Sequence, residues 1–117
     1  MRYMLLIYSD PSAWAKLDAA HGDQMMKEYM AFTQRIAASG ELVAGDPLQG
    51  LDTATTIRVR DGRTTSTDGP FAETKEVLGG YYIVDVVDLD RASALAAEIP
   101  DARTGSVEVR PIHEMGG

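Results

Sequence analysis

Apolar and polar positions along the chain predict a mixture of strands and helices. The first candidate strand covers residues 2–8, and residues 3–8 are apolar at consecutive positions rather than at alternate ones. A run of this kind is typical of a strand that is buried on both faces. Asp10 and Pro11 then predict the start of a helix, because aspartate caps free backbone amides and proline suits the first helical position.

The segment that follows has the pattern of an amphipathic helix with an interruption near its beginning. Gly22 is expected to break the helix, and Asp23 can cap a second helical segment after it. Apolar residues then recur at spacings of three and four, which marks a buried helix face before a stop at Gly40. The residues expected on this face are Met25, Met26, Tyr29, Met30, Thr33, Ile36 and Ala37.

The rest of the chain predicts further strands and a second main helix. Asp61-Gly62 is a strong signal for a two-residue hairpin turn between two of these strands. A helix capped by Asp88 or Asp90 is expected to end at Pro100 and to bury Leu89, Ala92, Leu95, Ala96 and Ile99. The expected strands are Glu41–Gly45, Thr55–Arg60, Arg63–Thr67, Val77–Val87 and Ser106–Glu114.

This order of elements predicts an α+β fold of the ferredoxin-like type over a single domain, residues 1–117. Two helices would cover one face of an antiparallel sheet that carries an extra β-hairpin. The strands at 3–8 and 81–87 are apolar on both faces, with Asp85 as the exception, so the second face also needs a cover. A second copy of the chain is the simplest cover, which predicts a homodimer. The alternative is that the tyrosines of these strands tolerate partial exposure.

Composition and charge restrict the partners of the chain. The absence of cysteine excludes disulfides, thiolate metal sites and a cysteine nucleophile, and it suits a reducing cytoplasm. The net charge of −7, without a cluster of Lys and Arg, argues against direct nucleic-acid binding. The apolar N-terminal run is too short for a secretion signal or for a membrane span of about 20 residues. We therefore expect a cytoplasmic protein that contacts neither nucleic acid nor membrane.

Known motifs for metals and cofactors are missing from the sequence. Its two histidines, His21 and His113, are far apart and have no metal-ligand spacing with the scattered acids. Gly79-Gly80 is not followed by the Lys and Ser or Thr of a phosphate-binding loop. We therefore expect neither a metal nor a cofactor.

One loop carries a recognisable motif. Residues 68–73, Asp-Gly-Pro-Phe-Ala-Glu, closely resemble the signature of the DGPF group within the YCII-related domain family. The resemblance implies a ferredoxin-like subunit in a dimeric α/β-barrel assembly, in agreement with the packing argument. It extends over nearly the whole chain through residues 3–8, 44–45, 56–58, 79–82 and 107–111.

The resemblance says less about function than about fold. The wider family includes a chloromuconolactone dehalogenase, and the superfamily includes lactone isomerases and small monooxygenases. The dehalogenase-like branch carries a histidine on its first helix, paired with an aspartate as acid and base. The corresponding position falls near Glu28 here, and the nearest histidine is His21. The histidine–aspartate pair therefore cannot be carried over residue by residue.

The candidate catalytic residues are Asp68 and Glu73 of the motif. In a structural interpretation, Asp68 bonds nearby backbone amides and fixes a turn, while Phe71 anchors the loop in the core. In a catalytic interpretation, Asp68 and Glu73 lie at the mouth of a pocket and one of them is the general base. Arg58 could then hold the carboxylate of a substrate, unless it lies on a solvated strand face.

Phe71 and Tyr82 complete the candidate substrate-binding residues, and Trp14 either caps the pocket or covers the edge of the core. Two functions are consistent with this sequence. The first is a cofactor-independent enzyme that uses acid–base chemistry on a small organic acid or lactone. The second is a small-molecule-sensing or protein-interaction module linked to transcription, because DGPF proteins resemble a set often encoded beside sigma factors.

Overall fold

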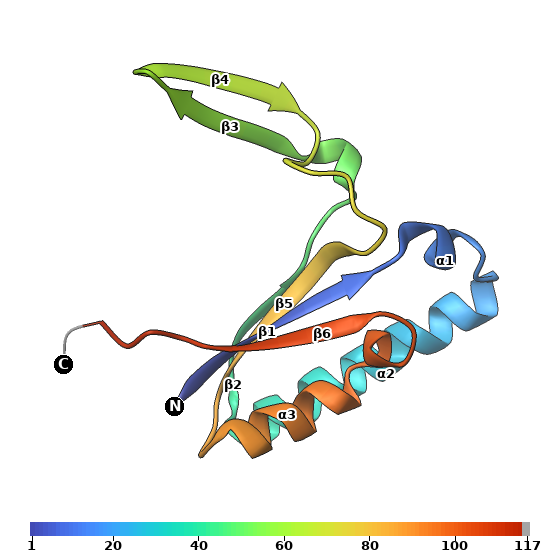
Figure 1. The fold of residues 1–117 in the computed structure, drawn as a ribbon. Helices are drawn as coiled ribbons and strands as arrows, with labels where there is room; N and C mark the ends of the chain where they lie inside the picture. Colours follow the sequence, from blue (N-terminus) through green and yellow to red (C-terminus); the bar gives the residue numbers. More distant parts are fainter. Residues whose placement is uncertain (116–117) are drawn as a thin grey trace.

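The computed structural model describes residues 1–115 and has an α+β architecture (Figure 1). Four strands form an antiparallel sheet, and two long helices cover one of its faces. The strand order β2-β5-β1-β6 is consistent with the ferredoxin-like prediction. The elements of this body are β1 (Arg2–Ser9), α1 (Pro11–Ala15), α2 (Ala19–Ala38), β2 (Leu42–Pro47), β5 (Val77–Asp85), α3 (Leu89–Glu98) and β6 (Ser106–Pro111).

Capping side chains set the helix boundaries. Asp10 accepts a hydrogen bond from the Ser12 amide at 2.9 Å and begins α1 as predicted. Asp18 accepts from the His21 amide at 2.8 Å, so α2 begins one turn earlier than predicted. The predicted break at Gly22 is therefore wrong, because a single glycine costs a capped helix only about 1 kcal/mol. Gly40, with φ of +81°, follows the end of α2 as predicted.

The core lies between the two long helices and the sheet. Tyr3, Leu5 and Ile7 of β1 point into it from every second position of the strand. Helix α2 contributes Phe32, which the sequence pattern missed, and Ile36. The full set of buried apolar residues is Tyr3, Leu5, Ile7, Phe32, Ile36, Tyr82, Val84, Val86, Ala92, Leu95, Ala96 and Ile99.

Several residues expected in the core are exposed. The side chains of Met26 and Met30 are 54% and 58% exposed, and Ala37 is exposed as well. The prediction for these three positions is wrong, because α2 turns the face with Phe32 and Ile36 toward the sheet. Leu89 is also exposed, because it is the first residue of α3 and lies beyond the part of the helix that packs on the sheet.

A β-hairpin projects from this body as a separate two-stranded sheet (Figure 1). It consists of β3 (Thr55–Arg60) and β4 (Arg63–Asp68), close to the predicted bounds. Asp61 and Gly62 both have positive φ, 51° and 75°, which confirms the predicted two-residue turn. The loop that follows β4 leaves Phe71 79% exposed, so the expectation that Phe71 anchors this loop in the core is wrong.

The second face of the main sheet is not covered by a helix (Figure 1). Met4 and Leu6 of β1 and Ile83 of β5 lie on this face and are only half-buried. The prediction that both faces are buried is therefore not met within one chain. Strands β5 and β6 also end at Asp85 and Pro111, earlier than predicted.

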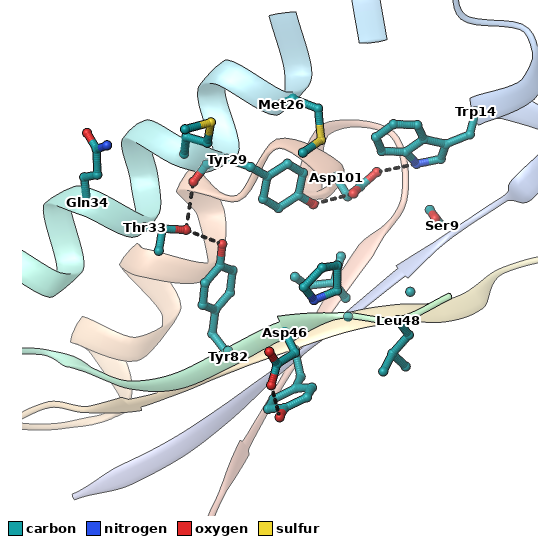
Figure 2. Close-up of a pocket in the computed structure, with 17 residues that line it drawn as sticks. Ser9, Trp14, Met26, Tyr29, Thr33, Gln34, Asp46, Leu48, Tyr82 and Asp101 are labelled. Atoms are coloured by element: carbon teal, nitrogen blue, oxygen red, sulfur yellow. Dashed lines mark hydrogen bonds between the residues drawn. The ribbon is translucent and has the colours of Figure 1, made fainter. Parts of the chain in front are cut away.

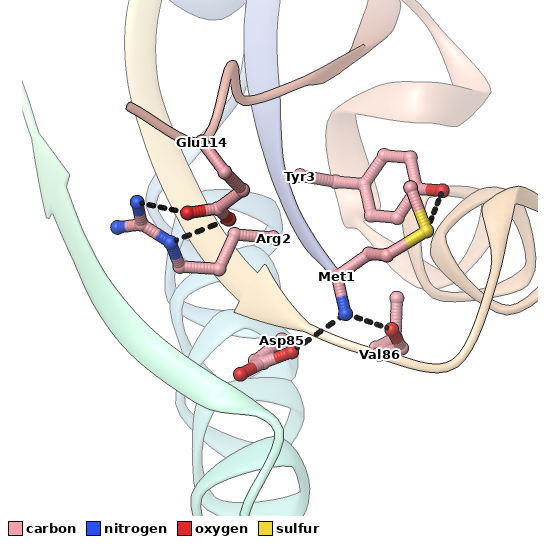
Figure 3. A network of polar contacts seen from close by, with 6 residues as sticks. All are labelled: Met1, Arg2, Tyr3, Asp85, Val86 and Glu114. Atoms are coloured by element: carbon pink, nitrogen blue, oxygen red, sulfur yellow. Dashed lines mark hydrogen bonds and ion pairs between the residues drawn. The ribbon is translucent and has the colours of Figure 1, made fainter. Parts of the chain in front are cut away.

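Charged groups gather at one end of the open face (Figure 3). The N-terminal ammonium group donates to the Asp85 carboxylate at 3.0 Å and to the Val86 carbonyl at 2.8 Å. The Arg2 guanidinium pairs with the Glu114 carboxylate through two hydrogen bonds of 3.1 Å. These contacts tie the beginning of β1 to the end of β5 and to the segment after β6.

Within residues 1–115, no helix is both long and apolar enough to cross a membrane. In the same residues, no three His, Cys, Asp or Glu side chains come together in a group that could hold a metal ion.

Candidate functional site

A cleft of about 590 Å³ opens between α2 and the sheet (Figure 2). This volume suits a small organic molecule. Helix α1 contributes Trp14 to its wall, α2 contributes Tyr29 and Thr33, and β5 contributes Tyr82. Met26 and Met30, the exposed methionines of α2, line this cleft rather than the core.

Asp101 is the buried carboxylate of the cleft, with 5% of its surface exposed. It lies in the 3₁₀ turn Pro100–Arg103, which follows α3. The indole Nε1–H of Trp14 donates to one carboxylate oxygen at 3.1 Å, and the Tyr29 hydroxyl donates to the other. Figure 2 shows the two aromatic side chains converging on this carboxylate from α1 and α2. Both partners are neutral, so they orient Asp101 without neutralising it.

Tyr29 is held in its neutral form. Burial raises the pKa of the Tyr29 hydroxyl, and the hydrogen bond to the Asp101 carboxylate raises it further. Tyr29 therefore stays protonated and acts as a hydrogen-bond donor to Asp101 throughout the neutral pH range.

A second hydrogen-bond chain lies one turn further along α2. The Thr33 hydroxyl donates to the Tyr29 carbonyl at 2.8 Å, and its oxygen lies 2.7 Å from the Tyr82 hydroxyl oxygen. Since a threonine hydroxyl has one hydrogen, the Tyr82 hydroxyl must be the donor in the second bond. Tyr82 then has no donor left for a ligand and can only accept.

Tyr82 is the sequence-predicted site residue that the structure places in the cleft. Its ring packs edge-on against Phe32, with ring centroids 5.2 Å apart. A Cβ atom at position 45 would lie 2.6 Å from the Tyr82 ring, so Gly45 leaves the space that this ring needs.

The other predicted site residues lie on the hairpin and the signature loop, outside the cleft wall of this chain. Asp68 is the last residue of β4, and both Asp68 and Glu73 are exposed. Arg58 is exposed on β3 and donates to the Phe71 carbonyl at 3.4 Å. No hydrogen bond between described residues uses the Asp68 carboxylate, so the turn is held by other groups. The Gly69 amide donates to the Ala54 carbonyl at 2.8 Å.

The comparisons with known proteins agree with the resemblance in the sequence. The family model of the YCII-related domain matches residues 1–116. The chain belongs to this family. It is similar to the uncharacterized protein R00369 of Rhizobium meliloti (strain 1021), with 36% identity over 114 residues. That match covers 96% of this YCII-related chain and 92% of the relative.

Sequence reasoning missed the main polar group of this YCII-related protein. Asp101 follows a helix-ending proline, a position that usually indicates an exposed turn. The spacing of apolar residues predicts that Tyr29 and Thr33 lie on the core-facing side of α2, which is the side that faces the cleft, but it does not indicate a site there. Trp14 carried a usable signal, because it is the single tryptophan of the chain and capping a pocket was one of its two interpretations.

Proposed function

We propose that this YCII-related protein binds a small organic molecule in the cleft and transfers a proton to or from it through Asp101, without a cofactor. The observation that carries the proposal is a buried carboxylate at an apolar, aromatic cleft. An ionised carboxylate has about four lone-pair positions. The bonds from Trp14 and Tyr29 use two of them, which leaves positions that can accept a substrate proton.

The proposed roles follow from the contacts. Asp101 is the general base and, once protonated, the general acid. Trp14 and Tyr29 are positioning residues, since each holds one carboxylate oxygen by a hydrogen bond. The apolar walls keep water from the carboxylate and so make it available to the substrate.

The signature loop is the second proposed source of a base. Asp68 and Glu73 would act there, with Arg58 and Phe71 holding an organic acid or lactone. In this chain they are exposed and lie outside the cleft wall. Their involvement therefore requires that another surface, such as a second copy of the chain, encloses the loop.

Ligand binding at the cleft is tested by two reporters that the sequence provides. The single tryptophan, Trp14, and the methyl groups of Met26 and Met30 all line the cleft. We expect 2-indanone, a compact neutral ketone, to change Trp14 fluorescence and to shift the two methionine methyl signals in NMR spectra. Met115, which is 81% exposed near the end of the chain, is the internal control. Shifts at Met115 without shifts at Met26 and Met30 would contradict the cleft as the binding site. Binding without proton transfer would instead favour the sensing function.

We also propose that the protein is a homodimer through the open face of its sheet. Met4, Leu6 and Ile83 form the apolar centre of this face. On the neighbouring strand β6, Glu108 is paired with Leu6 and Arg110 with Met4. An acidic and a basic side chain therefore lie beside the apolar centre. A two-fold copy can place these opposite charges against each other around an apolar centre, which is the usual anatomy of a protein interface.

The Leu6→Glu variant tests the dimer, because it adds a charge at the centre of the proposed interface. We expect the wild type to sediment as a dimer of 12.7 kDa chains and Leu6→Glu to sediment as a monomer. Leu17→Glu, in the turn between α1 and α2, is the matched control and is expected to remain dimeric. A monomeric wild type at micromolar concentration would refute this interface.

A further inference from the structure

The cleft offers negative charge without any basic side chain. Asp101 and Asp46 are the acids among its lining residues, and within residues 1–115 none of the lining residues is Lys, Arg or His. A free carboxylic acid would therefore meet like charge and find no cation. This lining argues against an anionic ligand for the cleft itself.

Asp101 has no cation to balance its charge. Its side-chain partners are an indole and a phenol, and none of the ion pairs between described residues includes it. Arg103 lies in the same 3₁₀ turn, but its guanidinium is paired with the Glu28 carboxylate at 2.5 Å. A buried carboxylate with only neutral partners is costly, and a positively charged ligand would offset that cost.

The hydrogen-bond chains of the cleft also call for a donor on the ligand. The indole of Trp14 and the hydroxyl of Tyr29 donate their hydrogens to the Asp101 carboxylate, and the Thr33 hydroxyl donates its hydrogen to the Tyr29 carbonyl. The Tyr82 hydroxyl donates its hydrogen to the Thr33 oxygen, because the single hydroxyl hydrogen of Thr33 is already used. What Asp101 and the two tyrosines still offer a ligand is a set of oxygen lone pairs, and Ser9 and Gln34 are the lining residues whose side chains keep a donor. An ammonium group, with three donors and no acceptor, complements this set.

The neighbouring walls suit an organic cation as well. The rings of Trp14 and Tyr29 lie on either side of the Asp101 carboxylate and point their N–H and O–H groups at it, so they hold it in place for a cationic group. The side chains of Met26, Met30 and Leu48 supply apolar surface at the cleft for the body of a ligand. A molecule with one cationic end and a compact apolar body would match both parts of the cleft.

We propose that the ligand of this cleft is a small organic amine whose ammonium group binds the Asp101 carboxylate between Trp14 and Tyr29. The proposal rests on the proposed function, in that the cleft binds a small molecule, and it names the ligand's chemical class. It replaces the organic acid expected from the sequence with a ligand of opposite charge.

A matched series of ligands tests the charge preference. The compounds 2-aminoindane, 2-indanol and indane-2-carboxylate share one bicyclic body and are cationic, neutral and anionic at pH 7. We expect titrations followed by Trp14 fluorescence to give an affinity for the amine at least about tenfold above that for the alcohol, because a charge-assisted bond replaces a neutral one. The carboxylate is expected to bind more weakly than the alcohol.

Variants of single acids locate the effect. Asp101→Asn is expected to lower the affinity for the amine by about tenfold or more and to change the affinity for the alcohol by less than about threefold. Asp90→Asn, which removes an exposed charge at the start of α3, is the control and is expected to keep the preference for the amine. If Asp90→Asn lowered the affinity for the amine as much as Asp101→Asn, the net charge of the protein rather than Asp101 would be responsible, and the proposal would be overturned.

The outcomes separate this inference from the proposed function. Equal binding of amine and alcohol, or tighter binding of the carboxylate, would overturn the amine proposal and leave the cleft as a binding site. Absence of any response of Trp14 and of the Met26 and Met30 methyl signals to all three compounds and to 2-indanone would overturn both.

Discussion

Asp101→Asn is expected to slow the exchange of the α-protons of 2-indanone for deuterium by about 10²-fold or more, the usual contribution of a positioned general base. Asparagine has nearly the same shape as aspartate. It can still accept a hydrogen bond from Trp14 and can donate to the Tyr29 oxygen, so the site should keep its geometry. It has no carboxylate to take a proton from the ligand, so catalysed exchange should be lost while the fold remains.

The measurement follows the α-proton signals of 2-indanone by ¹H NMR in D₂O with wild-type protein and with each variant. In the wild type, Asp101 takes the α-proton and the electron pair of the C–H bond moves to the carbonyl oxygen, which gives the enolate. The Asp101 carboxyl exchanges its proton for deuterium from D₂O and returns a deuteron to the same carbon, which restores the ketone. Asp68→Asn and Glu73→Gln are the matched controls, because they change the carboxylates of the signature loop in the same way. Both are expected to exchange at the wild-type rate. If exchange were slow with Asp68→Asn or Glu73→Gln and fast with Asp101→Asn, the general base would be a carboxylate of the signature loop and not Asp101.

Gly105→Ala is expected to destabilise the fold by about 2–4 kcal/mol, because its methyl group has no space. A Cβ atom at this position would lie 2.2 Å from the Tyr8 carbonyl oxygen and 3.2 Å from the Ser9 Cα. Both are backbone atoms of β1, so a change of rotamer cannot relieve the clash. The Gly105 amide also donates to the Asp101 carbonyl at 2.7 Å, so a shift here would disturb the turn that carries the buried carboxylate.

Gly22→Ala is the matched control for this substitution. A Cβ atom at Gly22 meets nothing within 4 Å, and Gly22 lies inside α2. We expect this variant to be more stable than the wild type by about 0.5–1 kcal/mol, since alanine is the better helix former. Urea unfolding curves of the three proteins would measure the free energies of unfolding. A Gly105→Ala variant as stable as the wild type would show that β1 and the turn before β6 can separate without cost.

Local sequence signals were sufficient for most of the architecture. The Asp61-Gly62 turn, the helix start at Asp10 and the stop at Gly40 depend on residues that are neighbours in the chain, and the structure has all three. Predictions failed where a distant packing partner decided the outcome. The core-facing side of α2 is the clearest case, because packing against the sheet buries Phe32 and Ile36 and leaves Met26 and Met30 exposed.

For the candidate site, too, the sequence revealed what depends on neighbouring residues and missed what depends on tertiary packing. The motif at residues 68–73 can be recognised from the sequence because its residues are consecutive, and together with the other matching segments it indicates the YCII-related family, to which the chain belongs. The same motif drew attention to Asp68 and Glu73, which the structure leaves exposed on the projecting part of the chain. Tyr82, on a strand that the apolar run predicts, lies in the cleft wall.

The sequence by itself therefore determined the α+β class, the hairpin and the family, since each depends on periodicity, turn chemistry or a contiguous motif. Only the tertiary structure revealed the cleft and its carboxylate. The hydrogen bonds that define the site join Asp101 to Trp14 and Tyr29 across 87 and 72 positions of the chain. Burial of an aspartate arises from the packing of helix, turn and sheet around it, and no local pattern of residues records that packing.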